Sequence, residues 1–323
     1  MIKLTKSQET LRYLGESPGT GGQVKSPEDF IVEEIVEPKF LRKYRILGGK
    51  VQPIDGKYTL AIMRKRLLTT EQAVRRLSFH LKVNIGYAGL KDKFAVTSQY
   101  VTFSSNYETL LQTFRDDSMS VEKIGRTDRE IAPGDLASNR FTITLHNAKP
   151  TRILEELQVF PNYYGPQRFG KDGSNAELGR LIIQRRFDDA LKKINDMYKL
   201  RFTDIRQIDK KRLKFFVHAY QSLLFNEMLA AGKAAIIPGY SFVPPSVRKT
   251  EGIREQDFKI RELSMSFRGG PRDMFVQPKI EHSFSKGKLV LKFTLPRGAY
   301  ATSILREITK REDYICRTKT DTS

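Results

Sequence analysis

The sequence is poor in cysteine and histidine, the residue types that most often bind transition metals. Its single cysteine, Cys316, excludes a disulfide scaffold and a thiolate metal site, and is typical of proteins in a reducing cytoplasm. The four histidines lie more than sixty positions apart from one another, so no metal-ligand spacing occurs. We therefore expect no bound metal ion.

Long hydrophobic runs are also missing. No run approaches the roughly 18 apolar residues that a membrane-spanning helix needs, and the first twenty residues mix basic and acidic side chains instead of forming a signal peptide. The chain is nonetheless 39% apolar with 20 Phe and 13 Tyr, which excludes a disordered protein. These features predict a cytoplasmic protein with a real core and no membrane contact.

Acidic residues are outnumbered. The chain has 57 Lys+Arg against 37 Asp+Glu, a net charge of +20, and a folded chain with such an excess favours a polyanionic partner. Charge alone distinguishes neither RNA from DNA nor binding from catalysis. The basic residues form several clusters along the chain, which predict a broad basic surface: Arg64-Lys65-Arg66, Arg75-Arg76, Arg185-Arg186, Lys192-Lys193 and Lys210-Lys211-Arg212 with Lys214.

The usual cofactor and nucleophile loops are absent from the sequence. The stretch from Gly19 to Gly22 fails the dinucleotide pattern GxGxxG because Val24 stands where the third glycine belongs. No GxSxG elbow and no methyl-donor loop occurs. Any chemistry is therefore expected to use a carboxylate and no cofactor.

Periodicity and turn residues predict interleaved strands and helices without a regular βαβ repeat. This pattern favours the α+β class. The helix after Thr69 has a capping box with Gln72, and a second capping box pairs Ser174 with Glu177. The predicted strands are 29–35, 100–103, 141–145 and 289–295; the helices are 70–82, one from Ser174, 213–231 and 301–309; and 235–275 is irregular.

One acidic residue stands out between Gly86 and Lys93. Asp92 lies in a loop with glycines before it and with Lys91 and Lys93 on either side. Glycines let a backbone approach a ligand closely, and flanking cations keep a carboxylate ionised and nucleophilic. The alternative is an aspartate in an ordinary turn, salt-bridged to its neighbours.

Five ordered segments between residues 19 and 310 resemble the motifs of the TruD family of tRNA pseudouridine synthases. Two departures stand out: Tyr164 replaces the usual Phe, and residues 235–275 lack recognisable family motifs. The segments are Gly19-Thr20-Gly21 through Lys25 to Glu34, Gly89-Leu90-Lys91-Asp92-Lys93 with 95–99, Asn139-Arg140-Phe141-Thr142, 162–170 (NYYGPQRFG), and 295–303 with Arg306-Glu307.

The resemblance implies an enzyme that detaches uracil from its ribose, turns it and rejoins it through C5, without cofactor or metal. Asp92 would be the catalytic carboxylate, acting by attack on the ribose or by assisting a glycal intermediate. Lys25 is similar to the basic residue that pairs with this aspartate, and Asn139 to the one that positions its loop.

The resemblance also implies further contacts to RNA. Phe141 would be an aromatic platform for the flipped base, although its alternating pattern with Ile143 and Leu145 equally fits a core residue. Asn162, Gln167 and Arg168 would shape the pocket or hold phosphate; the two amides equally suit turn and cap positions.

We therefore predict an α+β pseudouridine synthase that acts on tRNA, by resemblance at uridine 13, with no cofactor and as a monomer. The predicted catalytic domain is discontinuous, comprising 1–158 and 276–323, with a family-specific subdomain inserted at 159–275. The main alternative is a non-catalytic RNA-binding or RNA-folding protein in which Asp92 is structural. An RNA methyltransferase would need the cofactor loop that is absent.

Overall fold

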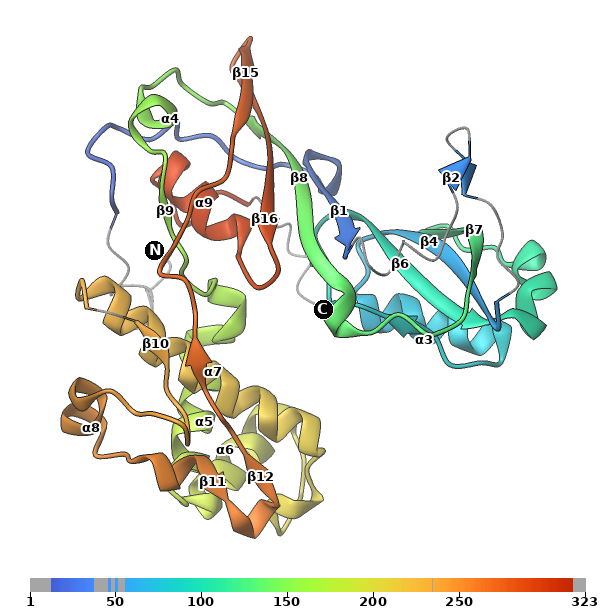
Figure 1. Ribbon diagram of the computed structural model, residues 1–323. Coiled ribbons are helices and arrows are strands. Elements are labelled where there is room, and N and C mark those ends of the chain that lie inside the picture. Colours follow the sequence, from blue (N-terminus) through green and yellow to red (C-terminus); the bar gives the residue numbers. More distant parts are fainter. Residues whose placement is uncertain (1–12, 38–45, 48–49, 52–55, 234, 316–323) are drawn as a thin grey trace. The chain divides into compact units, whose positions relative to one another are not determined.

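The computed structural model describes residues 13–37, 46–47, 50–51, 56–233 and 235–315 (Figure 1). Cys316 and the first twelve residues lie outside this part of the chain. The chain forms two compact units. The sheet unit comprises Ser17–Gln158, Pro278–Ala301 and the described residues from Leu305 onward, and the helical unit comprises Val159–Gln277, Thr302–Ile304 and the described residues before Ser17.

The sheet unit is built on an eight-stranded mixed sheet in which only the β1–β6 pair is parallel among the described strands. Its order is β15–β16–β8–β1–β6–β4–β7, with β5 paired to β6. The strands are β1 (Phe30–Val36), β4 (Tyr58–Arg66), β5 (Gly86–Tyr87), β6 (Val96–Ser104), β7 (Met119–Thr127), β8 (Leu136–His146), β15 (Glu281–Ser285) and β16 (Lys288–Pro296); β2 (Ile46–Leu47) and β3 (Lys50–Val51) form a separate pair.

The predicted strands are confirmed within β1, β6, β8 and β16, and the α+β class with them. β1 begins one residue later than expected because Pro27–Asp29 form a 3₁₀ turn. Asp29 closes this turn by accepting hydrogen bonds from the backbone N–H groups of Lys25 and Ser26. Alternate residues of β8, including Phe141, Ile143 and Leu145, are buried, as expected for a strand with one face on a core.

Helix α3 (Thr70–Leu81) packs against β4 and β6 in the sheet unit (Figure 1). Its predicted capping box is confirmed: the Gln72 N–H donates to Thr69 Oγ1 at 3.1 Å, and the Thr69 N–H donates to Gln72 Oε1 at 2.9 Å. The helix ends at Leu81 because Lys82 adopts a left-handed conformation with φ 55°. Ala73, Leu77 and Leu81 bury its apolar stripe.

The helical unit has its core among three helices, α5 (Ser174–Ile183), α6 (Phe187–Tyr198) and α7 (Lys210–Ala230). The predicted capping box of α5 is wrong, because Gly173 in a left-handed conformation is the N-cap and Ser174 is already helical. The carboxylate of Glu177 pairs with Lys193 instead. α7 begins three residues earlier than predicted, since Asp209 accepts a hydrogen bond from the Lys211 N–H and so caps the helix at that point.

The remaining elements are short. Residues 235–275 are irregular, as predicted, apart from brief strands and one helix. α9 has the predicted bounds. These elements are α4 (Ile153–Glu156), β9 (Phe160–Pro161), β10 (Ile236–Ile237), α8 (Pro245–Glu251), β11 (Lys259–Ile260), β12 (Met265–Ser266), β13 (Gly270–Pro271), β14 (Phe275–Val276) and α9 (Ala301–Thr309), with 3₁₀ turns at 27–29, 105–113, 133–135, 166–168, 171–173, 205–207, 255–258 and 261–263.

Candidate active site

Asp92 lies in the loop between β5 and β6 and is exposed. The neighbouring backbone is tied to two regular elements. The Lys91 N–H donates to Thr70 Oγ1 at 2.9 Å, and Thr70 donates in turn to Gln99 Oε1 at 3.0 Å. Gln99 Nε2 donates to the Gly89 carbonyl at 3.2 Å. The first residue of α3 and a buried residue of β6 therefore hold this loop in place.

Lys91 forms a buried ion pair on the inner side of the loop. Its Nζ lies 2.6 Å from Glu34 Oε1 of β1, and the two side chains are 3% and 0% exposed. Glu34 Oε2 also accepts a hydrogen bond from the Tyr100 N–H at 2.9 Å. Lys91 is therefore paired with Glu34, and its predicted action as a cation on Asp92 stays a prediction.

Lys65 is the buried cation beneath the Asp92 loop. Its Nζ donates to the Leu68 carbonyl at 2.6 Å and to the Asp92 carbonyl at 3.0 Å, and the residue is 2% exposed. Burial lowers the pKa of Lys65 to about 8; the charge of Asp92 opposes this shift and that of Lys91 adds to it. The sequence prediction placed Lys65 in a surface basic cluster, yet alternation from Ala61 and Met63 along β4 was a signal that it faces inward.

The glycines before Asp92 lie where the loop packs closely against the rest of the protein. A Cβ atom at Gly86 would lie 2.6 Å from Thr102 Oγ1 and 3.1 Å from the Ile131 carbonyl. A Cβ atom at Gly89 would lie 3.1 Å from a methyl carbon of Leu136. These glycines let the loop pack closely against the protein itself, which restricts where Asp92 is presented.

Asn139 and Phe141 of β8 share the inner face of the sheet with residues that support the loop. Asn139 is directly opposite Glu34 in the β1–β8 ladder, and Phe141 is opposite Val32; directly opposed residues point to the same face. Val32 is next to Thr97 of β6, which is opposite Lys65 of β4.

The two β8 side chains differ in their surroundings. Among the described residues, Asn139 Oδ1 is buried without a hydrogen-bond partner. Phe141 is 5% exposed, and its ring contacts Phe30 edge-on at 6.1 Å and stacks on Phe293 at 5.4 Å between centroids. This packing favours the core alternative for Phe141, whereas a buried unsatisfied amide oxygen is suited to binding something further.

Lys25 lies before the 3₁₀ turn at 27–29 and is exposed. Its backbone N–H donates to Asp29 Oδ2 at 3.1 Å, and Asp29 Oδ1 is 2.8 Å from His146 Nε2 of β8. Burial raises the pKa of Asp29, but the hydrogen bonds from His146, Ser26 and Lys25 outweigh it, and the net shift is downward. Asp29 thus has a structural role at the start of β1. The pairing of Lys25 with Asp92 stays a prediction.

Two of the predicted RNA-binding residues in the helical unit have described side chains, and both contact the protein itself. Asn162 is 6% exposed: its Nδ2 donates to the Asp273 carbonyl at 2.8 Å, and its Oδ1 accepts from Arg272 at 2.7 Å. Arg168 is half-buried, with its guanidinium 5.3 Å from the ring centroid of the exposed Phe215. Gln167 lies in the 3₁₀ turn at 166–168, and its side chain is outside the described part.

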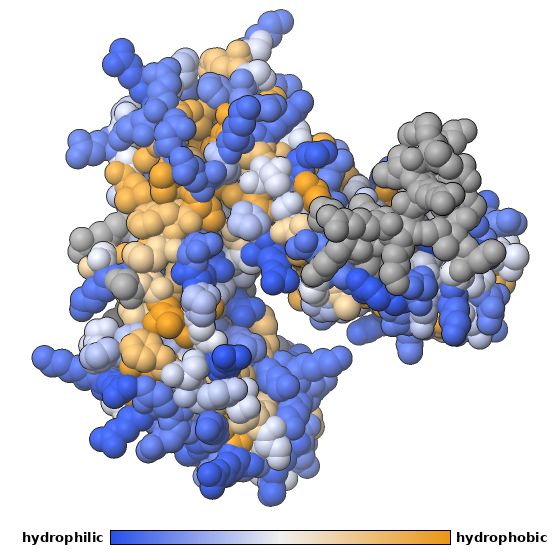
Figure 2. All heavy atoms as spheres, viewed as in Figure 1, coloured by the Kyte–Doolittle hydropathy of each residue, from blue (hydrophilic) through white to orange (hydrophobic). Residues whose placement is uncertain are grey.

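The basic clusters differ in whether their side chains bind the protein itself or are exposed to solvent. Arg185 donates to the carbonyls of Ile183, Asp257 and Lys259, so it is a structural tie. In contrast, several basic residues of the α7 cluster are exposed, and hydrophilic residues cover much of the visible face of the helical unit (Figure 2). The exposed members of this cluster are Lys210, Lys211, Arg212 and Lys214.

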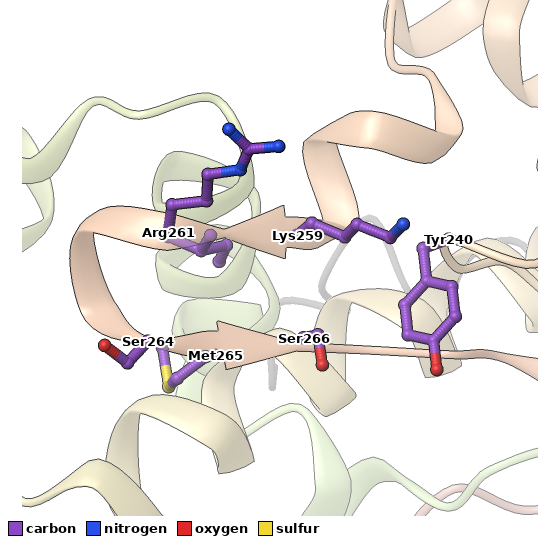
Figure 3. A pocket seen from close by; sticks show the side chains of 7 residues that line it. Tyr240, Lys259, Arg261, Ser264, Met265 and Ser266 are labelled. Carbon is purple, nitrogen blue, oxygen red and sulfur yellow. The ribbon is translucent and has the colours of Figure 1, made fainter.

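A shallow hollow adjoins the β11–β12 hairpin of the helical unit. Lys259 extends toward Tyr240, with its ammonium 5.2 Å from the ring centroid, and Ser264 and Ser266 also line the hollow (Figure 3). Another hollow, on the sheet unit, is lined by Glu33, Arg64, Tyr100 and Arg140 among others. Asp92 lines neither of them.

The described residues contain neither a metal-binding cluster nor a membrane-spanning helix. In this part of the chain, no group of three or more His, Cys, Asp or Glu residues could hold a metal ion. Within the same residues, every helix is too short or too polar to cross a membrane.

Comparison with known proteins gives a consistent result over most of the chain. A protein from Pyrococcus abyssi named "Probable tRNA pseudouridine synthase D" is 26% identical over 94% of this chain and 99% of its own. The tRNA pseudouridine synthase D of Wolinella succinogenes is 34% identical over 68% of this chain and 56% of its own. A TruD crystal structure from Methanosarcina mazei has the same fold, with TM-score 0.65 and 23% identity over 93% of this chain and 96% of its own.

A family model assigns the class of protein. The model described as "tRNA pseudouridine synthase D (TruD)" matches residues 8–200 and 243–308, so the class is that of isomerases that modify tRNA. The chain belongs to the TruD family of tRNA pseudouridine synthases. The match resumes at residue 243, within the stretch 235–275 in which the sequence shows no recognisable family motif.

Proposed function

We propose that this enzyme converts uridine 13 of tRNA to pseudouridine, with Asp92 as the catalytic carboxylate and without a cofactor. The observation that carries the proposal is the contrast within one loop. Gly89 and Lys91 are bound by Gln99, Thr70 and Glu34, while Asp92 is exposed on this support. Fixed placement of a reacting group is a large source of rate enhancement.

The chemistry balances without any co-reactant, because uridine and pseudouridine are isomers. The bond between ribose C1′ and uracil N1 breaks, a bond from C1′ to C5 forms, the proton at C5 leaves, and N1 gains one. Asp92 would act either by attack of its carboxylate on C1′ or by assisting a glycal intermediate. In both routes the protein has to supply an ionised carboxylate and a pocket that retains the detached uracil.

The remaining predicted residues are assigned to holding RNA. The target uridine has to leave its stack, at a cost of a few kcal/mol. Asn139 is proposed to contact the loop or the base, and its buried unpartnered oxygen supports this role. Phe141 is kept as the proposed stacking platform. Its burial between Phe30 and Phe293 favours a core role instead, so this assignment most needs a test.

The helical unit is proposed to be the family's inserted subdomain, at 159–275, and to bind the tRNA backbone. The basic residues of α7 together with Arg168 and the exposed ring of Phe215 support this role, since basic and aromatic groups bind phosphates and bases respectively. Lys25 is proposed to pair with Asp92 when RNA is bound.

The test is to map pseudouridine in unmodified tRNA before and after incubation with purified protein in buffer without cofactors. New pseudouridine at position 13 is the expected result. A matched tRNA in which cytidine replaces uridine 13 should gain none. Modification at another position only would contradict the assigned site, and no modification of any tRNA tested would contradict the proposed reaction.

A further inference from the structure

We propose that Lys65 is a positioning residue for catalysis: its buried ammonium holds the backbone of Asp92 and supplies the positive charge that acts on the Asp92 carboxylate. This inference rests on the proposed function of Asp92. It assigns a role to a residue that lies outside the five family motifs identified in the sequence.

The first support is the set of atoms that the ammonium joins. Lys65 Nζ donates to the carbonyls of Leu68 and Asp92, at 2.6 and 3.0 Å. Leu68 lies in the connection between β4 and α3, and Asp92 in the loop between β5 and β6. One side chain thus links the start of the α3 region to the residue proposed to react. The ties from Thr70, Gln99 and Glu34 are made to Gly89 and Lys91, and Lys65 extends this support to the backbone of Asp92.

The second support is that the lysine is unfavourable where it lies. It is 2% exposed on the inner face of β4, next in alternation to the buried Ala61 and Met63. Burial lowers the pKa of Lys65 to about 8, which shows that its charged form is disfavoured there. An apolar side chain at this position would continue the buried inner face of β4 without the free-energy cost of burying a charge. A residue that lowers the stability of the fold at its position tends to have a function.

The third support is the set of charges around the ammonium. The charged groups that act on it are Asp92, which stabilises its charge, and Lys91, which opposes it. Lys91 is itself paired with Glu34. Arg64 and Arg66, on either side of Lys65 in β4, are exposed and pair with Glu122 and Glu28. Of this basic run, only Lys65 is directed toward the Asp92 loop.

The experiment measures the single-turnover rate at saturating tRNA as a function of pH, together with tRNA affinity and melting temperature. For Lys65→Met we expect the rate to fall by about 100-fold, the scale of a displaced catalytic group, with tRNA affinity changed less than about threefold. Because an opposite charge near a carboxylate favours its ionised form, the acid limb of the profile should also move to higher pH. The control, Lys292→Met, removes an exposed strand lysine of β16 and should match the wild type in rate and profile.

Each outcome decides the proposal. A Lys65→Met rate within threefold of the wild type overturns it. A lower rate with an unmoved acid limb also overturns it, because loss of packing alone would give that result. If Lys65→Met fails to fold, Lys65→Gln is measured by the same criteria, since it keeps a donor and loses the charge. An inactive wild type would instead contradict the proposed function itself.

Discussion

In the sheet unit, the polar residues around the Gly-Leu-Lys-Asp segment hold an exposed carboxylate in place, whereas in the helical unit the motif residues with described side chains contact the protein itself. Thr70, Gln99 and Glu34 bind the loop that carries Asp92. Asn162, by contrast, is bound on both sides of its amide by Arg272 and the Asp273 carbonyl. Similar residue types in motifs of one family therefore support an exposed carboxylate in one unit and make internal contacts in the other.

The largest effect on stability should come from breaking the buried support of the loop. Lys91→Met leaves the Glu34 carboxylate buried without its partner, which we expect to cost about 3–5 kcal/mol of unfolding free energy. The matched variant Arg64→Met breaks an exposed pair with Glu122 and should cost at most about 1 kcal/mol. Denaturant unfolding of both variants measures the difference, and equal costs would mean that the support of the loop is not special.

The pH dependence of stability should show the cost of the buried Lys65. Its pKa is about 8 in the folded protein against an ordinary value of 10.5, so below pH 8 the burial cost is present in full. Between these values the folded protein has released a proton that the unfolded chain retains, and the cost is lost as pH rises. Relative to Lys65→Met, the wild type should gain up to about 3 kcal/mol between pH 7 and 10.5. A constant difference in unfolding free energy across this range would show that Lys65 is not buried as a cation.

In the helical unit, Asn162→Ala should affect stability more than catalysis. The variant loses hydrogen bonds to Asp273 and Arg272, with an expected cost of about 1–3 kcal/mol. The single-turnover rate at saturating tRNA should stay within threefold of the wild type. A hundred-fold loss of rate in a stable variant would place Asn162 in the substrate pocket and remove the contrast between the units.

A smaller effect on stability than at Asn162 is expected at Phe141. Phe141→Leu keeps an apolar side chain between Phe30 and Phe293, so a core residue should lose only about 1–1.5 kcal/mol of stability and no rate. A stacking platform would instead lose about 1–3 kcal/mol of transition-state stabilisation, or roughly five- to a hundred-fold in rate. Melting temperature and single-turnover rate of this one variant separate the two roles.

Sequence patterns predicted the elements well wherever a local rule was sufficient. The alternation of β8 and β16 and the capping box of α3 were correct. The capping box predicted from Ser174 and Glu177 at α5 is wrong, because the position of an N-cap also depends on backbone conformation. At α3 the N-cap Thr69 is extended, with ψ 156°, whereas at α5 the N-cap is Gly173, which is left-handed with φ 76°. That conformation depends on the preceding glycine-rich turn, which the capping pattern does not encode.

The sequence motif predicts Asp92 as the central residue of the site, and this assignment stays a prediction. The pairing of Lys91 with Glu34 and the inward position of Lys65 were not predicted. Both were missed because the partners are distant in sequence: Glu34 is 57 positions from Lys91, and Asp92 is 27 positions from Lys65. Such ties depend on strand order, which the local pattern does not specify.

The central claim is that the carboxylate of Asp92 performs the reaction while the surrounding loop merely holds it. The most direct measurement is the single-turnover formation of pseudouridine by Asp92→Asn at saturating tRNA, with tRNA affinity and melting temperature determined on the same sample. Because the amide is nearly the same size and the anchoring contacts involve the Asp92 carbonyl and its neighbours, folding and binding should be retained while the rate falls at least about a thousandfold. A variant that keeps a tenth of the wild-type rate would contradict the account.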